Sequence, residues 1–146
     1  MKLELQLIPA SSFCSNLRNH IGQDKWTLLS KKIRNEHKRK CQICGWQESY
    51  TQRQYTHLHE VWSFDMKTGI QKLVGFECIC PTCHNVHHWG CSELRGEDMD
   101  KLIAHACRIN KCTRIEWMAY VDKSFREWSK RSDIEWNIDL GGYNGL

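Results

Sequence analysis

Residues 78–88, CICPTCHNVHH, bring three cysteines and three histidines together within eleven positions. Cys80 and Cys83 form a Cys-x-x-Cys pair, and Cys41 and Cys44 form another earlier in the chain. Four thiolates in two such pairs complete the closed tetrahedral shell of a structural zinc. An ion bound in this way would fasten together the two ends of the intervening segment and contribute folding energy. The sequence therefore predicts a structural Zn²⁺ held by these four cysteines.

The number of cysteines favours zinc over a disulfide framework. The chain has nine cysteines, an odd number, in 146 residues, which is long for a small disulfide-rich secreted domain. Zinc knuckles are typical of a reducing compartment, so we expect a cytoplasmic protein. No stretch approaches the roughly 18–20 apolar residues of a membrane span. The opening MKLELQLIP lacks the uninterrupted apolar core of a signal peptide.

Four histidines have spacings that place them on common faces. His84 and His88 are four residues apart and would share one face of a helix. His57 and His59 are two residues apart and would share one face of a strand. A zinc that draws the helix back beside the strand would set the two pairs opposite each other, as a second, open metal site requires. The alternative is that all four are polar residues satisfied around a zinc ribbon.

A hairpin and a short helix are expected to carry these residues. Residues 55–64 and 70–78 have strand patterns, and the DMKTG between them supplies a five-residue connection that contains Gly69. A short helix should run from the second Cys-x-x-Cys pair through His88. Gly45, directly after the first pair, suits the positive φ that a knuckle turn commonly needs.

Amphipathic helices are predicted on both sides of this hairpin. A basic helix covers about 24–40, with its apolar residues at helical spacing. Two further helices cover about 98–131. Thr113 and Glu116 form a capping box in front of the second of them.

The two ends of the chain alternate apolar and polar residues. Segments 3–7 (LELQL) and 134–140 (IEWNIDL) therefore predict short strands, which are candidates to pair with each other. The chain has no internal repeat and no long linker. We therefore expect one domain of α+β class over 1–146, large enough to have a core of its own.

Basic residues are concentrated before the first knuckle, although the formal net charge is only +4. Residues 25–40 hold seven lysines and arginines against one acidic residue, Glu36. Such a cluster could meet the phosphates of a nucleic acid, and the alternative is a solvated helix face. With one later arginine added, the candidate nucleic-acid contacts are Lys31, Lys32, Arg34, Lys38, Arg39, Lys40 and Arg53.

The order and spacing of these motifs resemble the HNH, or ββα-metal, nucleases, also called His-Me finger enzymes. The resemblance rests on Cys41-x-x-Cys44, a strand ending in His59, and Cys80-x-x-Cys83-His84-x-x-x-His88. More narrowly, THLHEVWSFDMKTGIQKLVGFECICPTCHNVHHWG is similar to microbial proteins labelled HNH endonucleases. In that group a His-x-His-Glu-x-Trp strand and a Gln-x-Leu-x-Gly strand precede a Cys-x-x-Cys-His helix. The narrower likeness extends from 16–18 to 131–136, most of the chain.

The resemblance implies a ββα-metal core at about 41–90, a separate four-cysteine zinc, and flanking helices and short terminal strands. It implies a metal-dependent endonuclease that hydrolyses phosphodiester bonds in DNA, in a bacterial or phage-infected cell. One divalent ion, Mg²⁺ or a transition metal, would be held by His59, His84 and His88. Such an ion stabilises the leaving oxygen and its phosphate while a general base activates water.

Two alignments of the first strand leave the general base open. Matching His59-Glu60 to the family's pattern makes His59 the metal ligand and Glu60 the base. The alternation of the strand instead puts His57 and His59 on one face, with one of them as the base. His59 is essential under either alignment.

One position departs from the family's pattern. Many HNH sequences have an asparagine five residues before the second knuckle, where it orients the base, and this chain has Gly75 there. Gln71 and Asn85 could substitute, although neither stands at the matching place. The departure favours a second hypothesis, a catalytically inactive HNH-like zinc module that binds nucleic acid or a protein partner.

Overall fold

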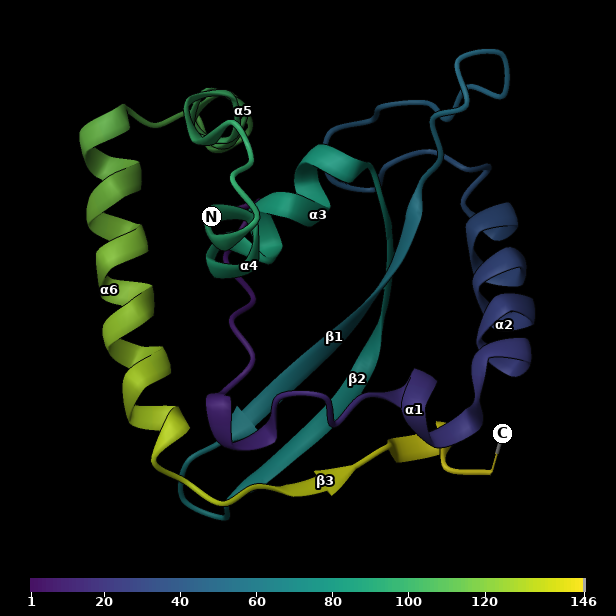
Figure 1. Ribbon diagram of the computed structural model, residues 1–146, viewed down its shortest axis with the longest axis vertical. Helices are drawn as coiled ribbons and strands as arrows, with labels where there is room; N and C mark the ends of the chain where they lie inside the picture. The colour runs from purple at the N-terminus through teal and green to yellow at the C-terminus, as the bar shows by residue number, and fades with distance from the viewer. Residues whose placement is uncertain (146) are drawn as a thin grey trace.

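A computed structural model describes residues 1–145 of the chain as an α+β protein with a three-stranded sheet. Figure 1 shows a long diagonal hairpin with helices on either side of it. None of the described helices combines the length and the apolarity that crossing a membrane requires. In chain order the elements are η1 (Ala10–Ser12), α1 (Leu17–Ile21), α2 (Gln23–Glu36), β1 (His57–Asp65), β2 (Ile70–Ile79), α3 (Pro81–His87), α4 (Trp89–Leu94), α5 (Met99–Asn110), α6 (Arg114–Ser132), β3 (Asn137–Asp139) and η2 (Gly141–Tyr143).

The hairpin forms where the sequence predicts it. β1 and β2 pair antiparallel, from His57 opposite Ile79 down to Asp65 opposite Ile70, with a register shift after Val61. The carboxylate of Asp65 accepts hydrogen bonds from the next backbone N–H groups of the turn, at 2.9 and 3.3 Å. Gly69 has a φ of 69°, a value that favours glycine, and it leads directly into β2.

The two faces of the hairpin pack against different helices. Leu58 and Leu73 belong to a small core with residues of α1 and α2. Ile79 belongs to a larger core with α3, α4, α5 and α6. In Figure 1, α2 and α3 lie on opposite sides of the hairpin. Because successive side chains of a strand alternate in direction, His57 and His59 point away from the face that Leu58 occupies and toward α3.

The prediction of an N-terminal strand is wrong. Segment 3–7 is extended, and Leu3 and Leu7 are buried as the alternation suggested, but no strand pairs with it. Its backbone N–H groups bond instead to groups on three helices: Leu3 N to Asn110 Oδ1 at 2.8 Å, Leu5 N to Tyr120 Oη at 2.9 Å and Gln6 N to the His87 carbonyl at 2.9 Å. These partners take backbone N–H groups that a neighbouring strand would otherwise bind.

The C-terminal strand is shorter than predicted and has a different partner. β3 covers three residues and pairs parallel with the start of β2, from Ile70 opposite Asn137. The N–H of Asn137 donates to the carbonyl of Gly69 at 2.9 Å, and this hydrogen bond holds the start of β3 beside the start of β2. The terminal segments therefore do not meet as a pair.

The helices agree with the sequence in position and differ in their ends. The basic helix, α2, ends at Glu36 because Lys38 and Arg39 adopt positive φ values of 54° and 53°. Two short helices, α1 and α4, were not expected. The capping box in front of α6 is present: Thr113 Oγ1 accepts from the N–H of Glu116, whose carboxylate accepts from the N–H of Thr113.

A buried carboxylate ties the loop before the hairpin to α2. The side chain of Glu48 is only 1% exposed and pairs with Arg34 at 3.1 Å and with Arg39 at 2.9 Å. The backbone N–H and the hydroxyl of Thr56 each donate to it at 2.8 Å. Burial pushes the pKa of Glu48 up, but the hydrogen bonds from Arg39, Thr56 and Arg34 outweigh that effect and hold it at about 2.

Replacing Glu48 by alanine is expected to lower the free energy of unfolding by about 3 kcal/mol, because two largely buried guanidinium groups lose their partner. Urea unfolding measures this directly. Asp100→Ala is the matched control, since its ion pair with Arg114 is exposed on both sides and should contribute less than about 1 kcal/mol. Equal losses in the two variants would contradict the structural role of Glu48.

Candidate metal centres

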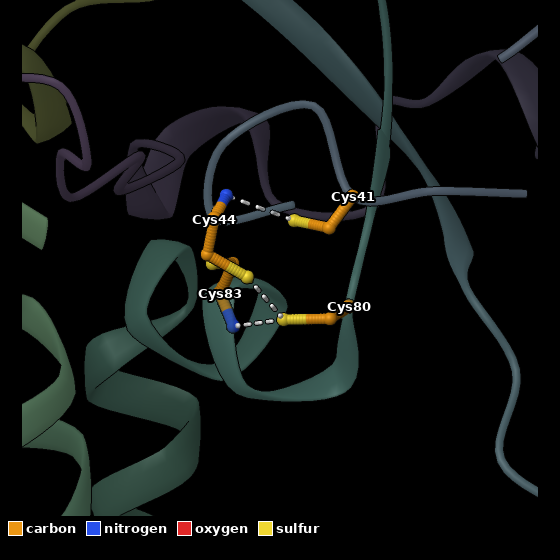
Figure 2. Close-up of side chains that lie close together, drawn as sticks. All are labelled: Cys41, Cys44, Cys80 and Cys83. Carbon is orange, nitrogen blue, oxygen red and sulfur yellow. Dashed lines mark hydrogen bonds between the residues drawn. The ribbon is translucent and has the colours of Figure 1, made fainter. Parts of the chain in front are cut away.

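The four knuckle cysteines meet at one place. Cys41 and Cys44 lie in the loop after α2, Cys80 directly follows β2 and caps α3, and Cys83 lies in the first turn of α3. Their sulfur atoms all lie within 4.8 Å of one another, as Figure 2 illustrates. The turn of the first knuckle depends on Gly45, which has a φ of 78° and donates its N–H to the carbonyl of Cys41 at 2.9 Å.

Each knuckle points a backbone N–H at its own first sulfur. The N–H of Cys44 lies 3.5 Å from the sulfur of Cys41, and the N–H of Cys83 lies 3.3 Å from that of Cys80. The sulfur of Cys44 lies 3.6 Å from that of Cys80 across the cluster. Figure 2 shows these three contacts as dashed lines.

The ionisation of Cys41, Cys80 and Cys83 favours a cation among them. Hydrogen bonds from Cys80 and Cys83 lower the pKa of Cys41 far below the ordinary value of a thiol. The hydrogen bond with Cys41 raises the pKa of Cys80 to about 12, and contact with both neighbours raises that of Cys83 well above its ordinary value. Several thiolates can therefore form together only around a positive charge. A cluster of four sulfurs, three of them on buried residues, is the donor set of a structural metal, and zinc fits it.

Three imidazoles meet at a second place. One ring nitrogen each of His59, His84 and His88 lies within 4.8 Å of the others. His59 is buried on β1, His84 is half-buried in α3, and His88 is the C-cap residue directly after α3. The ring centroids are 5.5 Å apart for His59 and His84, 5.0 Å for His59 and His88, and 4.7 Å for His84 and His88.

His57 joins this group from the same strand face. Its Nδ1 lies 3.0 Å from the Nδ1 of His84, close enough for one ring to donate to the other. Its own side chain is exposed. The sequence spacing that put the two strand histidines on one face, opposite the two helix histidines, therefore agrees with the structure.

His59 is held by two residues that sequence reasoning missed or left open. Its Nε2 lies 2.8 Å from Oε1 of Gln6, on the extended N-terminal segment. The ring of His87 stacks against it at 4.7 Å. His87 is itself fixed at both nitrogens, at 2.6 Å from the carbonyl of Glu4 and at 3.1 Å from the carboxylate of Glu77. His87 is buried, and these contacts give it a structural role.

Burial keeps the three imidazoles neutral. It lowers the pKa of His84 to about 3 and that of His88 to about 4, with further contributions from neighbouring imidazoles and from Arg95. Burial together with the other rings lowers the pKa of His59 even further. Neutral rings keep a lone pair available, which metal ligation requires.

These pKa values predict a loss of stability in mild acid. In the unfolded chain, His84 and His88 bind protons below about pH 6.5. In the folded protein the same rings bind protons only below about pH 3 to 4. The free energy of unfolding should therefore fall as the pH drops from about 7 to about 5, with a slope approaching about 1.4 kcal/mol per pH unit for each such ring. Urea unfolding across this range should give a smaller slope in a His84→Asn/His88→Asn variant. Equal slopes would contradict the burial of neutral imidazoles, because the thiol cluster is common to both proteins.

Glu60 lies on the other face of β1 from His59. One carboxylate oxygen accepts a hydrogen bond from the N–H of Leu17 at 3.0 Å, at the start of α1. Burial raises the pKa of Glu60. The contact anchors α1 to the hairpin and is a structural role for this side chain.

The substitutes for the missing asparagine do not reach His59. Gly75 itself lies opposite Val61 in the hairpin. Gln71 is fully buried near the far end of the hairpin, opposite Phe64. Asn85 accepts a hydrogen bond from Arg95 at 3.2 Å and so positions that arginine.

The imidazoles border a groove of about 870 Å³. Apolar side chains form much of its lining, among them Trp62, Trp128 and the exposed Phe13 and Leu94. Its charged lining consists of two arginines and two glutamates: Arg18, Arg95, Glu60 and Glu93. The groove thus combines a mostly apolar wall, a balanced charge and the three neutral rings.

The predicted nucleic-acid contacts lie elsewhere. Arg34 and Arg39 form ion pairs with the buried carboxylate of Glu48. The remaining five are exposed: Lys31, Lys32, Lys38, Lys40 and Arg53. Those on α2 lie across the hairpin from α3 and from the imidazoles that it carries (Figure 1).

Sequence reasoning had no signal for the partners that come from distant segments. The fold brings Gln6 and Glu77 to the imidazole cluster and His105 to the thiol cluster. Comparison of the chain with protein-family models, with curated proteins and with solved structures finds no match to any of them. The chemistry of the two clusters is therefore the ground for a functional proposal.

Proposed function

We propose that this protein is a metal-dependent nuclease of HNH type that hydrolyses phosphodiester bonds in DNA. The observation that carries the proposal is the meeting of three neutral imidazoles at the wall of a groove, separate from a closed cluster of four thiols. A four-sulfur site is filled by its own ligands, whereas three nitrogens leave positions open for water and a phosphate oxygen. The pairing of β1, β2 and α3 around the imidazoles supports a ββα-metal core.

The hydrogen bonds around the rings suit metal ligation. The amide oxygen of Gln6 can only accept, so Nε2 of His59 carries the proton and its Nδ1 keeps the lone pair. If Nδ1 of His84 donates to His57, its Nε2 is free in the same way. Such outer partners fix the tautomer and orientation of metal-binding histidines. A divalent ion bound here would supply Lewis-acid stabilisation of the phosphate and the leaving oxygen.

His57 is the general base in this proposal. With His59, His84 and His88 as ligands, it is the remaining imidazole of the group, and it lies 3.0 Å from His84. Partial desolvation of its exposed ring, with a smaller contribution from the charge of Arg34, lowers its pKa, so the ring is unprotonated at neutral pH. Its Nδ1 can accept a proton from water once that nitrogen is released from the contact with His84. Glu60 also lines the groove, but it is less suited, because its carboxylate accepts the N–H of Leu17 at the start of α1.

The ligand set favours a transition metal over Mg²⁺. Imidazole nitrogens suit ions such as Zn²⁺ and Ni²⁺, while Mg²⁺ prefers carboxylate and water oxygens. No carboxylate belongs to the three-imidazole group among the described residues. We therefore expect Mn²⁺, Co²⁺ or Ni²⁺ to support cleavage better than Mg²⁺.

The groove favours a strand with unpaired bases. Aromatic side chains such as Phe13 and Trp128 can stack on bases, and Arg18 and Arg95 can contact phosphates. A duplex would instead require a broad basic surface around the imidazoles, and the lysine-rich helix lies across the hairpin from them.

An inactive module that binds nucleic acid or a protein is the second candidate. Gly75 supports it, because no side chain at that position orients His59, and so does the separation of the lysines from the imidazoles.

Cleavage assays with the wild-type protein separate the two candidates. Plasmid, single-stranded circular DNA and RNA would each be incubated with Mg²⁺, Mn²⁺, Co²⁺ or Ni²⁺, and bound metal would be counted on the same preparation. The nuclease predicts transition-metal-dependent cleavage, fastest on single-stranded DNA, and a second metal-binding event beyond one tightly held zinc. One zinc per chain, no second binding event and no cleavage would establish the inactive module instead.

A further inference from the structure

His105, on α5, touches the thiol cluster from outside. Its Nε2 lies 3.1 Å from the sulfur of Cys83, and its Nδ1 lies 3.1 Å from Nη2 of Arg108, one turn further along the helix. The ring is half-buried, and Arg108 is exposed. α5 therefore contributes a chain of two contacts that ends on one of the four sulfurs.

The chemistry of the two partners fixes the direction of these hydrogen bonds. A guanidinium has only donors, so Nδ1 of His105 must accept from Arg108. A neutral imidazole that accepts at Nδ1 carries its proton on Nε2, and that proton points at the sulfur of Cys83. The arrangement is a relay from guanidinium to imidazole to sulfur.

With this relay, three of the four sulfurs of the cluster have an N–H group directed at them. Backbone N–H groups of the knuckles already point at the sulfurs of Cys41 and Cys80. Cys83 receives its N–H from His105 instead, a side chain 22 positions away in the sequence. Within residues 1–145, Cys44, the half-buried member, is the one sulfur with no N–H directed at it.

Basic side chains beside the thiol cluster also favour a bound zinc. Zn²⁺ bound by four thiolates carries two net negative charges, which burial makes costly without nearby cations or N–H donors. Lys101, His105 and Arg108 recur at helical spacing and line a cleft of about 540 Å³ next to the cluster. No carboxylate is among the described residues that line this cleft.

We propose that His105 and Arg108 form an outer hydrogen-bond relay that holds the Cys83 sulfur in position and so slows the release of zinc. The inference rests on the four-cysteine zinc and is independent of nuclease activity. The N–H group of His105 stabilises the negative charge on the sulfur and fixes the direction of its lone pairs. Zinc release then begins at Cys44, the ligand without such a donor. Outer partners of metal ligands typically change metal affinity by about 10–100-fold.

The test measures zinc transfer from the whole protein to a chromophoric chelator. His105→Phe keeps a ring of similar size without the N–H and should release zinc about 10–100-fold faster than the wild type. Arg108→Met should give a smaller effect in the same direction, and the double variant should equal His105→Phe, since the two residues act in series. In the Co²⁺-substituted protein, His105→Phe should shift the sulfur-to-cobalt charge-transfer bands.

Lys101→Met is the matched control, because this lysine lines the same cleft without bonding to His105. It should release zinc at the wild-type rate. Equal acceleration in Lys101→Met and His105→Phe would overturn the relay and leave only general charge compensation. Should His105→Phe fail to fold, His105→Gln restores an N–H at that distance and should keep slow release, whereas fast release would overturn the relay. A wild-type protein without bound zinc would overturn the relay and the zinc site together, whatever the outcome of the cleavage assays.

Discussion

Replacing Cys80 by serine is expected to unfold the protein. Cys80 directly follows β2, caps α3 and contributes a sulfur to the four-thiol cluster, so one substitution weakens the connection between the hairpin and the helix. Structural zinc contributes about 10–16 kcal/mol of apparent binding free energy in zinc-finger peptides. A whole domain is stable by only about 5–15 kcal/mol, so the chain should not remain folded without its zinc. Circular dichroism and zinc content, measured on one preparation, would show loss of both.

Cys107→Ala is the control for this result. Cys107 is half-buried and lies outside the four-thiol cluster, so its removal should cost about 1 kcal/mol and leave the zinc bound. Treatment of the wild type with a strong chelator should reproduce the unfolding of Cys80→Ser. A Cys80→Ser variant that keeps its secondary structure and its urea midpoint would show that the cluster is not a structural metal site.

Replacing His84 by alanine is expected to abolish cleavage while the thiol cluster keeps its zinc. His84 touches every other ring of the proposed site, at centroid distances of 4.9 Å to His57, 5.5 Å to His59 and 4.7 Å to His88. Removing His84 takes away a metal ligand and also the side chain that contacts His57, the proposed base. The loss should be about 10³-fold or more, since a positioned base alone contributes about 10²–10⁴-fold. Single-turnover cleavage and calorimetric titration with Mn²⁺ would show loss of activity and of the second metal.

Two further variants assign the roles. His57→Ala should lose activity but still bind the second metal, because His57 is the base and not a ligand in this proposal. His37→Ala should leave both unchanged, since His37 is an exposed imidazole at the end of α2. A His84→Ala variant as active as the wild type would remove the imidazole cluster from the mechanism, and a His57→Ala variant that loses the metal would make His57 a ligand.

The features that the sequence predicts well depend on neighbouring residues. The Cys-x-x-Cys turns, the positive φ of Gly45, the hairpin around Gly69 and the capping box before α6 each involve contacts within a few positions. Such contacts depend on backbone geometry and on local hydrogen bonds, which the residue types specify directly.

The meeting of the imidazoles is an intermediate case. The periods of a strand and of a helix predict which histidines share a face. The two cysteine pairs predict that a shared zinc brings the helix back beside the strand. The structure agrees for His57, His59, His84 and His88. The spacing does not say that His57 lies outside the group of three, or that Glu60 turns to α1.

What only the tertiary structure decided are the partners supplied by distant segments. The N-terminal segment has the alternation of a strand, yet Asn110 and Tyr120 take its backbone N–H groups, and β3 pairs with β2 instead. The basic run reads as a phosphate-binding surface, yet Glu48 takes two of its arginines. Gln6 and His105 reach the two clusters across separations of 53 and 22 residues. Residue types and spacing thus determined the two sets of potential ligands, because these sets are built from local periodicity. Packing decided which side chains surround and orient them, because many sequences could supply such a donor or acceptor and only the fold selects the one within reach.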